Sequence, residues 1–563
     1  MYTNKEIAKI LRLHGQLLEL HGEDVFKYRT YQSASFKISK LDKPLAEMTV
    51  EQLNKIDGIG TALSNKIYQL VTEGSFNEFN KFTEKTPSGI IEILKIKGMG
   101  PKKIGVLWKE LEIEPPGELL YACNENRLLD LKGFGKKTQD QIIHAIEYSI
   151  LNKGKFLYAT AENIAIQLLN DLRSEGIGKN ISLTGEIRRK SIVLEKIEIL
   201  IATENQDEVI DFIKSNPLIH PTTEIVNEDN VLKFETINGL KTEFFICNPD
   251  EFYYQLIITT GNTAHIESLN LKGLEKSFSE KEIYKYNKSS YVEPEMREGL
   301  GEVELAKSNK IPVLISEEDI KGIIHNHSTY SDGVNTLEEM ATYCKDKGYE
   351  YFAICDHSKS AFYANGLSIE RIILQQKEID KLNIILSPFK ILKGIESDIL
   401  NDGSLDYPDE ILSTFDLVVA SIHSNFKMDK EKATNRLLKA IENPYTTILG
   451  HPTGRLLLAR EGYPVDHQKI IDACAANGVV MELNANPYRL DMDWKWIGYA
   501  LSKGVMISIN PDAHSIEGIH DLHYGLCVAR KGGLTGQMTF NTLSLYELEN
   551  YLSIKKNKTQ LSI

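Results

Sequence analysis

Residues 322–333 read GIIHNHSTYSDG, a short apolar stretch that ends in the potential metal ligands His325, His327 and Asp332. Six later stretches repeat this arrangement of apolar residues followed directly by polar ones. They are YFAICDH (351–357), ILKGIES (391–397), LVVASIHS (417–424), TTILGHP (446–452), VVMELNANP (479–487) and VMISINPDAH (505–514). Amphipathic helical stretches lie between several of them. The alternation predicts seven βα units whose parallel strands close into a barrel, with its site at the C-terminal strand ends.

The polar clusters are rich in metal-ligating side chains. Imidazole and carboxylate together suit Zn²⁺, Mn²⁺ or Fe²⁺ better than Mg²⁺ or Ca²⁺. In the HxH and DxH sequences both ligands face the same side, because strand side chains repeat every two residues. A buried, hydrogen-bonded histidine would explain any one of these residues, but it does not explain the whole set at strand ends. We therefore expect two or three divalent ions, held by His325, His327, Asp332, His357, Glu396, His423, His451, Asp512 and His514.

Such a multi-metal site indicates phosphoester hydrolysis. The ions orient a phosphate ester, neutralise its charge and activate a water for attack at phosphorus. Arg455 and Arg460 follow one cluster in GHPTGRLLLAR, and Arg489 follows another in NANPYRLD. Guanidinium groups beside the ions would grip a substrate phosphate, and structural ion pairs are the alternative for these arginines.

Residues 1 to about 150 are predicted to be all-helical, with a repeated unit of helix, Gly-x-Gly turn and helix. The three copies are LNKIDGIGTALSNKIYQLV, ILKIKGMGPKKIGVLWKEL and LLDLKGFGKKTQDQIIHAI. The glycines permit a tight turn and leave N–H groups at a helix N-terminus, which holds a phosphate whatever the base sequence. A plain helical hairpin would explain one copy. Three copies favour DNA-backbone binding by Gly58, Gly60, Gly98, Gly100, Lys102, Lys103, Gly133, Gly135, Lys136 and Lys137.

The net charge of −14 over 563 residues argues against a nucleic-acid partner when it is taken alone. The first 115 residues are nearly neutral, however, and their lysines accompany the hairpins, while bound ions would offset carboxylates of the barrel. We find no apolar run long enough for a membrane span and no signal peptide, and the six cysteines lie far apart without a CxxC pair. These features favour a cytoplasmic protein with reduced thiols and no membrane partner.

The motifs HNHSTYSDG, CDHS, GIESDIL, GHPTGRLL and NPDAH resemble the PHP (polymerase and histidinol phosphatase) domain, and essentially the whole chain resembles the bacterial family X DNA polymerases. The resemblance implies a multidomain chain: an N-terminal all-α helix-hairpin-helix region, an α/β nucleotidyltransferase-like palm with a thumb, and a C-terminal (βα)₇ TIM-like PHP barrel. The expected domains are 1–80, with the first hairpin; 81–150, fingers-like with two further hairpins; 151–240, the palm; 241–312, the palm end and thumb; and 316–563, the PHP domain.

The resemblance also implies how the ions are held and what they do. One ion would be held by His325, His327, Glu396 and Asp512, the residues that act catalytically through bound metal. A second would share Glu396 with His423 and His451, and a third would use Asp332, His357 and His514. The implied activity is a 3′–5′ exonuclease on DNA, with 3′-phosphatase or abasic-site endonuclease activity as further options.

The palm departs from the family pattern, which has a Gly-Ser-x-Arg-Arg turn and three aspartates that hold two Mg²⁺ ions. Here residues 185–189 read GEIRR, and Lys196, Glu198 and Glu243 stand at the aspartate positions. An ammonium group repels Mg²⁺ and can pair with both glutamates. We expect that the palm keeps its fold and that polymerase activity is lost or strongly impaired.

The favoured hypothesis is a monomeric DNA-repair nuclease that acts on gapped, nicked or 3′-end primed DNA. The alternatives are a gap-filling polymerase that is still active, a small-molecule phosphatase of the histidinol phosphatase type, and a non-catalytic DNA-end scaffold. Lys66 lies where related repair polymerases place a Schiff-base lysine, but an ordinary solvated helix lysine is the simpler interpretation.

Overall fold

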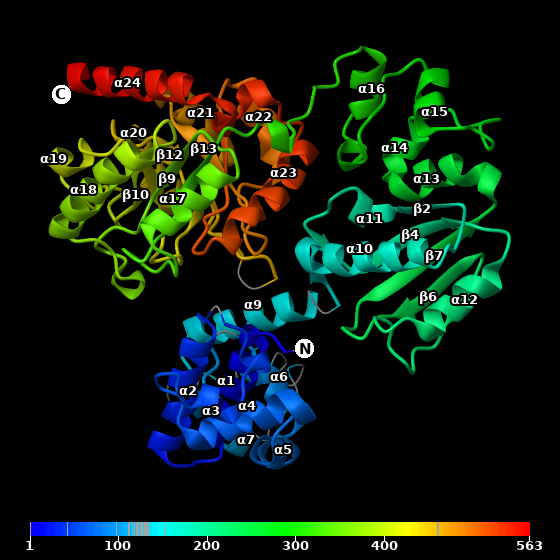
Figure 1. The fold of residues 1–563 in the computed structure, drawn as a ribbon, viewed down its shortest axis with the longest axis horizontal. Coiled ribbons are helices and arrows are strands. Elements are labelled where there is room, and N and C mark those ends of the chain that lie inside the picture. Colours follow the sequence, from blue (N-terminus) through cyan, green and yellow to red (C-terminus); the bar gives the residue numbers. More distant parts are fainter. Residues whose placement is uncertain are drawn as a thin grey trace. The chain divides into compact units, whose positions relative to one another are not determined.

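The computed structural model describes residues 2–110 except 42 and 97, residues 134–151, 154–458 and 461–562, and six positions between 113 and 128. The chain divides into two compact units, residues 1–153 and 154–563 (Figure 1). All six cysteines are buried and free. Across the described residues, we find no helix with the length and apolar character that a membrane span requires.

The first unit is helical around one apolar core. A capping box starts its first helix, because the Thr3 hydroxyl accepts from the N–H of Glu6 while the Glu6 carboxylate accepts from the N–H of Thr3. Gly58 and Gly98 have φ angles of 85° and 88°, a left-handed conformation that favours glycine. Its helices are α1 (Asn4–Leu20), α2 (Val25–Ile38), α3 (Val50–Leu53), α4 (Thr61–Glu73), α5 (Asn77–Glu84), α6 (Ser88–Leu94), α7 (Pro101–Glu110) and α9 (Lys136–Leu151).

The second unit begins with a five-stranded mixed sheet of order β2-β4-β7-β6-β5. Its two central strands, β4 and β7, run parallel, with Lys196 opposite Lys241 and Glu198 opposite Glu243. The strands of this sheet are β2 (Asn180–Leu183), β4 (Lys196–Ala202), β5 (Val226–Glu228), β6 (Val231–Glu235) and β7 (Lys241–Cys247). Two short strands, β1 (Phe156–Leu157) and β3 (Val193–Leu194), pair antiparallel in a separate sheet. The helices are α10 (Tyr158–Ser174), α11 (Gly185–Arg188), α12 (Gln206–Ser215), α13 (Phe252–Thr260), α14 (Thr263–Glu267), α15 (Glu280–Tyr286) and α16 (Glu302–Lys307).

The rest of the second unit is a nearly closed barrel of seven parallel strands in sequence order, so the predicted (βα)₇ architecture is confirmed. The strands are β8 (Gly322–Asn326), β9 (Tyr351–Ile354), β10 (Lys390–Asp398), β11 (Leu417–Ser421), β12 (Ile448–Leu449), β13 (Val480–Asn484) and β14 (Ile507–Asn510). The helices are α17 (Leu337–Asp346), α18 (Ile369–Leu386), α19 (Asp409–Leu412), α20 (Lys430–Glu442), α21 (His467–Asn477), α22 (Ile497–Ser502), α23 (Leu522–Lys531) and α24 (Leu545–Ser562).

The first and last barrel strands meet just beyond their ends. Asn326 and Ala513 form a parallel bridge, and the His327 N–H donates to the Ala513 carbonyl at 2.8 Å. All residues of β8, β9, β11, β13 and β14 are buried. Helices surround the strands (Figure 1), and side chains fill the inside of a barrel of this size. Polar residues at the carboxyl ends of these strands therefore enter a site that has little contact with water.

Candidate metal centre

The structure brings all nine predicted ligands to the carboxyl ends of the barrel strands. Eight of them form overlapping groups, and within each group the candidate ligand atoms lie within 4.8 Å of one another. One group is His327, Asp332, His357 and His514, a second is His325, His327 and Asp512, and a third is His357, Glu396 and His423. His451 joins the third group, because its Nε2 lies 3.0 Å from Glu396 Oε1.

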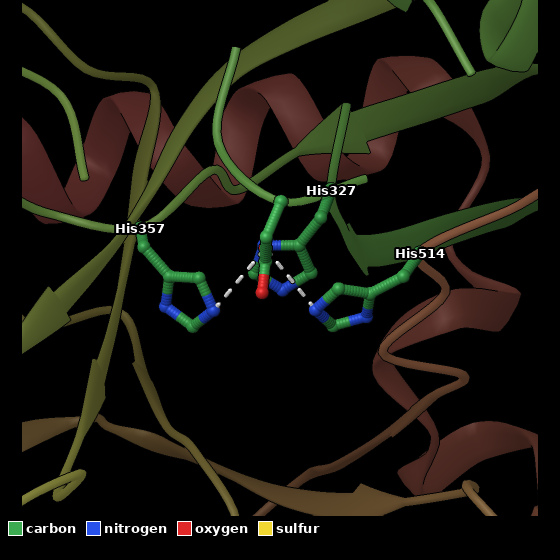
Figure 2. Close-up of side chains that lie close together, drawn as sticks. His327, His357 and His514 are labelled. Atoms are coloured by element: carbon green, nitrogen blue, oxygen red, sulfur yellow. Dashed lines mark ion pairs between the residues drawn. The ribbon is translucent and has the colours of Figure 1, made fainter. Parts of the chain in front are cut away.

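The first group gathers loops that follow three different strands. Figure 2 shows His357 and His514 on either side of His327, with all three rings facing a common centre. Asp332 Oδ1 lies 3.3 Å from His514 Nε2 and 3.7 Å from His357 Nε2. Asp332, His357 and His514 are the residues that the family resemblance implied as ligands of a third ion. The structure adds His327, whose ring centroid lies 4.2 Å from that of His514.

Glu396 is the carboxylate at the centre of the remaining ligands. Its Oε1 lies 3.2 Å from His325 Nε2, 3.1 Å from His423 Nε2 and 3.0 Å from His451 Nε2. Its Oε2 lies 2.8 Å from His357 Nδ1. One carboxylate within reach of four imidazoles has the arrangement of a ligand that two cations share.

Several of these atoms are close together without being hydrogen-bonded. Among the described residues, His325 Nε2, His357 Nδ1 and Glu396 Oε2 are buried and have no hydrogen-bond partner. A buried polar atom without a partner costs roughly 1–3 kcal/mol, so such atoms are rare unless an ion or a water satisfies them. Divalent cations would satisfy all three atoms, and the mixed imidazole and carboxylate donor set fits Zn²⁺, Mn²⁺ or Fe²⁺.

The protonation of the imidazoles follows from their neighbours. Burial, reinforced by His514 and His357, lowers the pKa of His327 to about 3, so this ring is neutral at pH 7 and can donate a lone pair. Burial also opposes charge on His423, but Glu396 and Asp398 outweigh it and raise the pKa of His423 to about 10. His423 would therefore have to release a proton in order to bind a cation.

Two carboxylates beneath the ligands were missed by the sequence reasoning. Glu482 Oε1 lies 2.5 Å from His325 Nδ1, and Asp398 Oδ1 lies 2.5 Å from His423 Nδ1. Each contact orients its ring so that Nε2 faces Glu396, as partners of metal-binding histidines do. A signal was present for Asp398, which follows Glu396 by two residues on β10 and so faces the same side.

Asp356 is a third acidic residue that the sequence reasoning did not assign. It is fully buried and accepts hydrogen bonds from the Ser328 N–H at 2.8 Å, the Ser328 hydroxyl at 2.7 Å and Gln375 Nε2 at 2.6 Å. It also accepts from the N–H of Ser331, the residue before the predicted ligand Asp332. Asp356 therefore fixes the loop that presents this ligand.

The predicted phosphate-binding arginines lie in different surroundings. Arg489 Nε is 3.7 Å from Asp512 Oδ2, at the edge of the cluster. Arg455 instead donates to Asp493 Oδ2 at 2.8 Å and to the backbone carbonyls of Arg489 and Leu490. Arg455 thus holds the loop that carries Arg489, and Arg460 lies outside the described residues. A phosphate contact stays a prediction for all three.

One ion-pair cluster in the mixed sheet joins the three residues that are predicted to stand at the family's aspartate positions. Lys196 Nζ lies 2.6 Å from Glu243 Oε2 and 3.0 Å from Glu198 Oε1. Glu198 Oε2 also accepts from the backbone N–H of Glu186 at 3.1 Å. Burial disfavours the ammonium, but the two glutamates outweigh it and raise the pKa of Lys196 above its ordinary value. The lysine therefore remains charged between the two carboxylates.

The hairpin residues lie at helix starts in the first unit. Gly60, Gly100 and Gly135 directly precede α4, α7 and α9, and a side chain added at any of them would meet open space. The predicted lysines follow two of these turns: Lys102, Lys103, Lys136 and Lys137. Gly133 lies outside the described residues. The positions suit a backbone-binding surface, and DNA contact by these residues stays a prediction.

Lys66 is held in an internal contact. Its ammonium hydrogen-bonds both the Tyr31 hydroxyl and Glu78 Oε2, and Lys27 pairs with Glu78 Oε1 at 2.8 Å. Burial favours the neutral amine, but Glu78 and Tyr31 outweigh it and raise the pKa of Lys66. This arrangement favours a structural lysine over a nucleophile.

Comparisons with known proteins agree with this arrangement. A family model for the helix-hairpin-helix domain matches residues 2–76, one for a SAM-like helix-hairpin-helix tandem matches 90–147, and one for the PHP domain matches 324–486. The DNA polymerase/3′-5′ exonuclease PolX of Bacillus subtilis (strain 168) is 34% identical over 571 residues, which cover 97% of this chain and 99% of that protein. A probable phosphatase of Thermoanaerobacter sp. (strain X514) is 28% identical over 42% of this chain and 95% of its own length.

Proposed function

The chain belongs to the PolX family of DNA polymerases/3′-5′ exonucleases, and we propose that it is a DNA-repair nuclease whose PHP barrel is a metal-dependent 3′–5′ exonuclease. The observation that carries the proposal is the convergence of four imidazoles on the buried Glu396. We propose the nine predicted residues as ligands of two or three Zn²⁺ or Mn²⁺ ions, with Fe²⁺ as a further option.

The residues of the barrel have distinct parts in this proposal. Bound divalent ions would neutralise the phosphodiester and activate a water for attack at phosphorus. Glu482 and Asp398 hold the rings of His325 and His423 in the ligating orientation. Arg489 lies beside the cluster and is placed to contact a substrate phosphate, while Arg455 holds its loop.

The mixed sheet supports the second part of the proposal, that polymerase activity is lost or strongly impaired. The Lys196 ammonium lies where the family pattern has a metal-ligating aspartate, and it is paired with Glu198 and Glu243. A cation would have to displace this ammonium before it could bind. Arg188 lies in residues 185–189, the segment compared with the family's Gly-Ser-x-Arg-Arg turn. Both of its Nη groups donate to Glu280, so this arginine is not available to a triphosphate.

A small-molecule phosphatase is the second candidate, because probable phosphatases match 42% of this chain over most of their own length. The helix-hairpin-helix matches over residues 2–76 and 90–147 favour DNA instead. The ligand cluster disfavours a non-catalytic scaffold. A preference for gapped, nicked or 3′-primed ends, a monomeric state and a cytoplasmic location remain parts of the proposal.

One assay tests nuclease and polymerase activity together. A 5′-labelled gapped duplex is incubated with the full chain in Mg²⁺, Mn²⁺ or Zn²⁺, with and without dNTPs, and analysed on a denaturing gel. We expect Mn²⁺-supported shortening of the 3′ end, no extension, and no shortening by the double variant His325→Ala/His327→Ala. Unchanged digestion by that variant would refute the nuclease site, and templated extension that Glu198→Ala abolishes would refute the loss of polymerase activity. Faster turnover of histidinol phosphate than of DNA would favour the phosphatase.

A further inference from the structure

The two carboxylate oxygens of Asp512 have different neighbours. Oδ1 lies 3.0 Å from His327 Nε2 and 3.7 Å from His325 Nε2, on the side of the other predicted ligands. Oδ2 accepts a hydrogen bond from Asn484 Nδ2 at 3.0 Å and lies 3.7 Å from Arg489 Nε. One oxygen therefore faces imidazoles, whereas the other faces an amide and a guanidinium.

The Asn484 amide is held in one orientation. Asn484 is the last residue of β13 and is fully buried. Its Oδ1 accepts a hydrogen bond from the backbone N–H of Asn486 at 3.1 Å. Because a backbone N–H can only donate, the amide oxygen must face Asn486 and the amide nitrogen must face the carboxylate. This nitrogen also lies 3.5 Å from Glu482 Oε2, so both of its protons have an acidic acceptor.

The same asparagine anchors the turn that carries Arg489. The N–H of Arg489 donates to the Asn486 carbonyl at 2.7 Å, and the N–H of Asn484 donates to the Asp491 carbonyl at 2.6 Å. The backbone of the turn is thus fixed at both ends. The guanidinium of Arg489 therefore moves by rotation of its side chain, without movement of the turn.

The contact between Arg489 and Asp512 is looser than the contact made by Asn484. A separation of 3.7 Å between Arg489 Nε and Asp512 Oδ2 exceeds a hydrogen bond, and the arginine side chain is 21% exposed. A phosphate offers a guanidinium two parallel hydrogen bonds, which is a stronger interaction. Arg489 can therefore leave Asp512 for a phosphate, and Asp512 Oδ2 then still has the hydrogen bond from Asn484.

We propose that Asn484 is a positioning residue with two linked effects. It holds Asp512 Oδ2, so that Oδ1 is the oxygen presented to a cation, and it keeps Oδ2 hydrogen-bonded when Arg489 turns to a substrate phosphate. Without this amide, the guanidinium would be the remaining described donor near a buried anionic oxygen, and Arg489 would stay on Asp512. The inference rests on the proposed function, because it takes Asp512 as a ligand and Arg489 as a phosphate contact.

Mn²⁺ binding tests the first effect. Isothermal titration of the metal-free full chain should show that Asn484→Ala weakens Mn²⁺ binding roughly 10- to 100-fold, because a partner that orients a ligand is lost. Asn484→Leu keeps a branched side chain without the donor and should behave alike. Asn541→Ala is the matched control, since Asn541 is equally buried but its amide nitrogen donates to the backbone of Gly322 and Ile509. Circular dichroism checks that each variant folds.

Kinetics on primed DNA at saturating Mn²⁺ test the second effect. We expect Asn484→Ala to raise KM about tenfold with little change in kcat, as Arg489→Ala does, because the arginine no longer reaches the phosphate. The double variant Asn484→Ala/Arg489→Ala should have the KM of the single variants, since both changes remove one shared contact. A purely structural asparagine would give effects that multiply.

Three results would overturn the inference. They are an unchanged Mn²⁺ affinity of Asn484→Ala, an equal loss of affinity in Asn541→Ala, and KM effects that multiply in the double variant. Failure of the wild type to shorten a 3′ end in Mn²⁺ would refute the proposed function instead. In that case the Mn²⁺ affinities would still decide whether Asn484 positions Asp512.

Discussion

Arg188 and Glu280 form a double hydrogen bond across 92 residues of sequence, from Nη1 to Oε1 at 2.9 Å and from Nη2 to Oε2 at 2.6 Å. The fully buried Arg297 adds a third bond to Glu280 at 2.6 Å. Arg188, which precedes β4 in the sequence, thus forms a structural ion pair within the second unit. This contact ties the mixed sheet to the helices that follow it.

Glu280→Gln should destabilise the second unit in a pH-dependent way. Burial opposes the charge of Glu280, but Arg188 and Arg297 lower its pKa to about 2. Because its pKa is lower in the folded chain than in the unfolded chain, Glu280 stabilises the fold at pH values above its unfolded pKa of about 4.3. This stabilisation disappears as the pH falls through its folded pKa. We expect a loss of about 3 kcal/mol at pH 7, shrinking between pH 4.5 and 2.

Urea unfolding followed by near-ultraviolet circular dichroism measures this difference. Glu267→Gln is the control, because Glu267 is an exposed carboxylate of the neighbouring helix α14. A constant difference between the wild type and Glu280→Gln over this pH range would contradict the assignment.

Glu482→Gln should weaken metal binding although Glu482 is not a proposed ligand. The amide cannot hold the ring of His325 as the carboxylate does, and loss of such partners costs roughly 10- to 100-fold in metal affinity. Isothermal titration with Mn²⁺ or Zn²⁺ measures the effect. Nuclease activity should recover at high metal concentration, whereas a misfolded variant would not recover. Glu370→Gln, at an exposed position of α18, should bind metal like the wild type.

Metal binding should release protons. Burial lowers the pKa of His423 and of His514, but neighbouring carboxylates outweigh it and raise these pKa values to about 10 and about 9. Both rings are therefore charged at pH 7 in the absence of a cation. A ligating imidazole is neutral, so metal affinity should rise as the pH increases from 6 to 9. Titration in buffers of different ionisation enthalpy counts the protons. Zero release at pH 7 would exclude these two residues as ligands.

Arg489→Ala and Arg455→Ala should differ in their kinetics. Removing a phosphate contact at Arg489 should raise KM for primed DNA about tenfold. Arg455→Ala removes the contact to Asp493 and frees the loop, so it should also lower thermal stability. Steady-state kinetics and thermal unfolding of both variants separate these effects. Equal stability losses would show that Arg489 is structural as well.

The sequence predicts best where a function depends on local spacing. His325 and His327 at a strand end, or Gly58 and Gly60 before a helix, can be recognised because the chemistry and the periodicity lie within a few residues. Glu482 could not be assigned in this way, because its role depends on His325, which is 157 residues away. The environment of Arg455 likewise depends on a loop 34 to 38 residues further along.

The meeting of β8 and β14 has a consequence for the newly made protein. The predicted ligands of one group come from the two ends of the barrel: His325 lies in the first strand and His327 just after it, and Asp512 follows the last strand. During synthesis, the ribosome has added nearly all of the barrel before Asp512 emerges. A nascent or truncated chain that stops before β14 lacks this predicted ligand, and the edge of β8 that faces away from β9 loses its bridge to Ala513. Such a chain would keep its helical first unit, but the proposed metal centre would be incomplete.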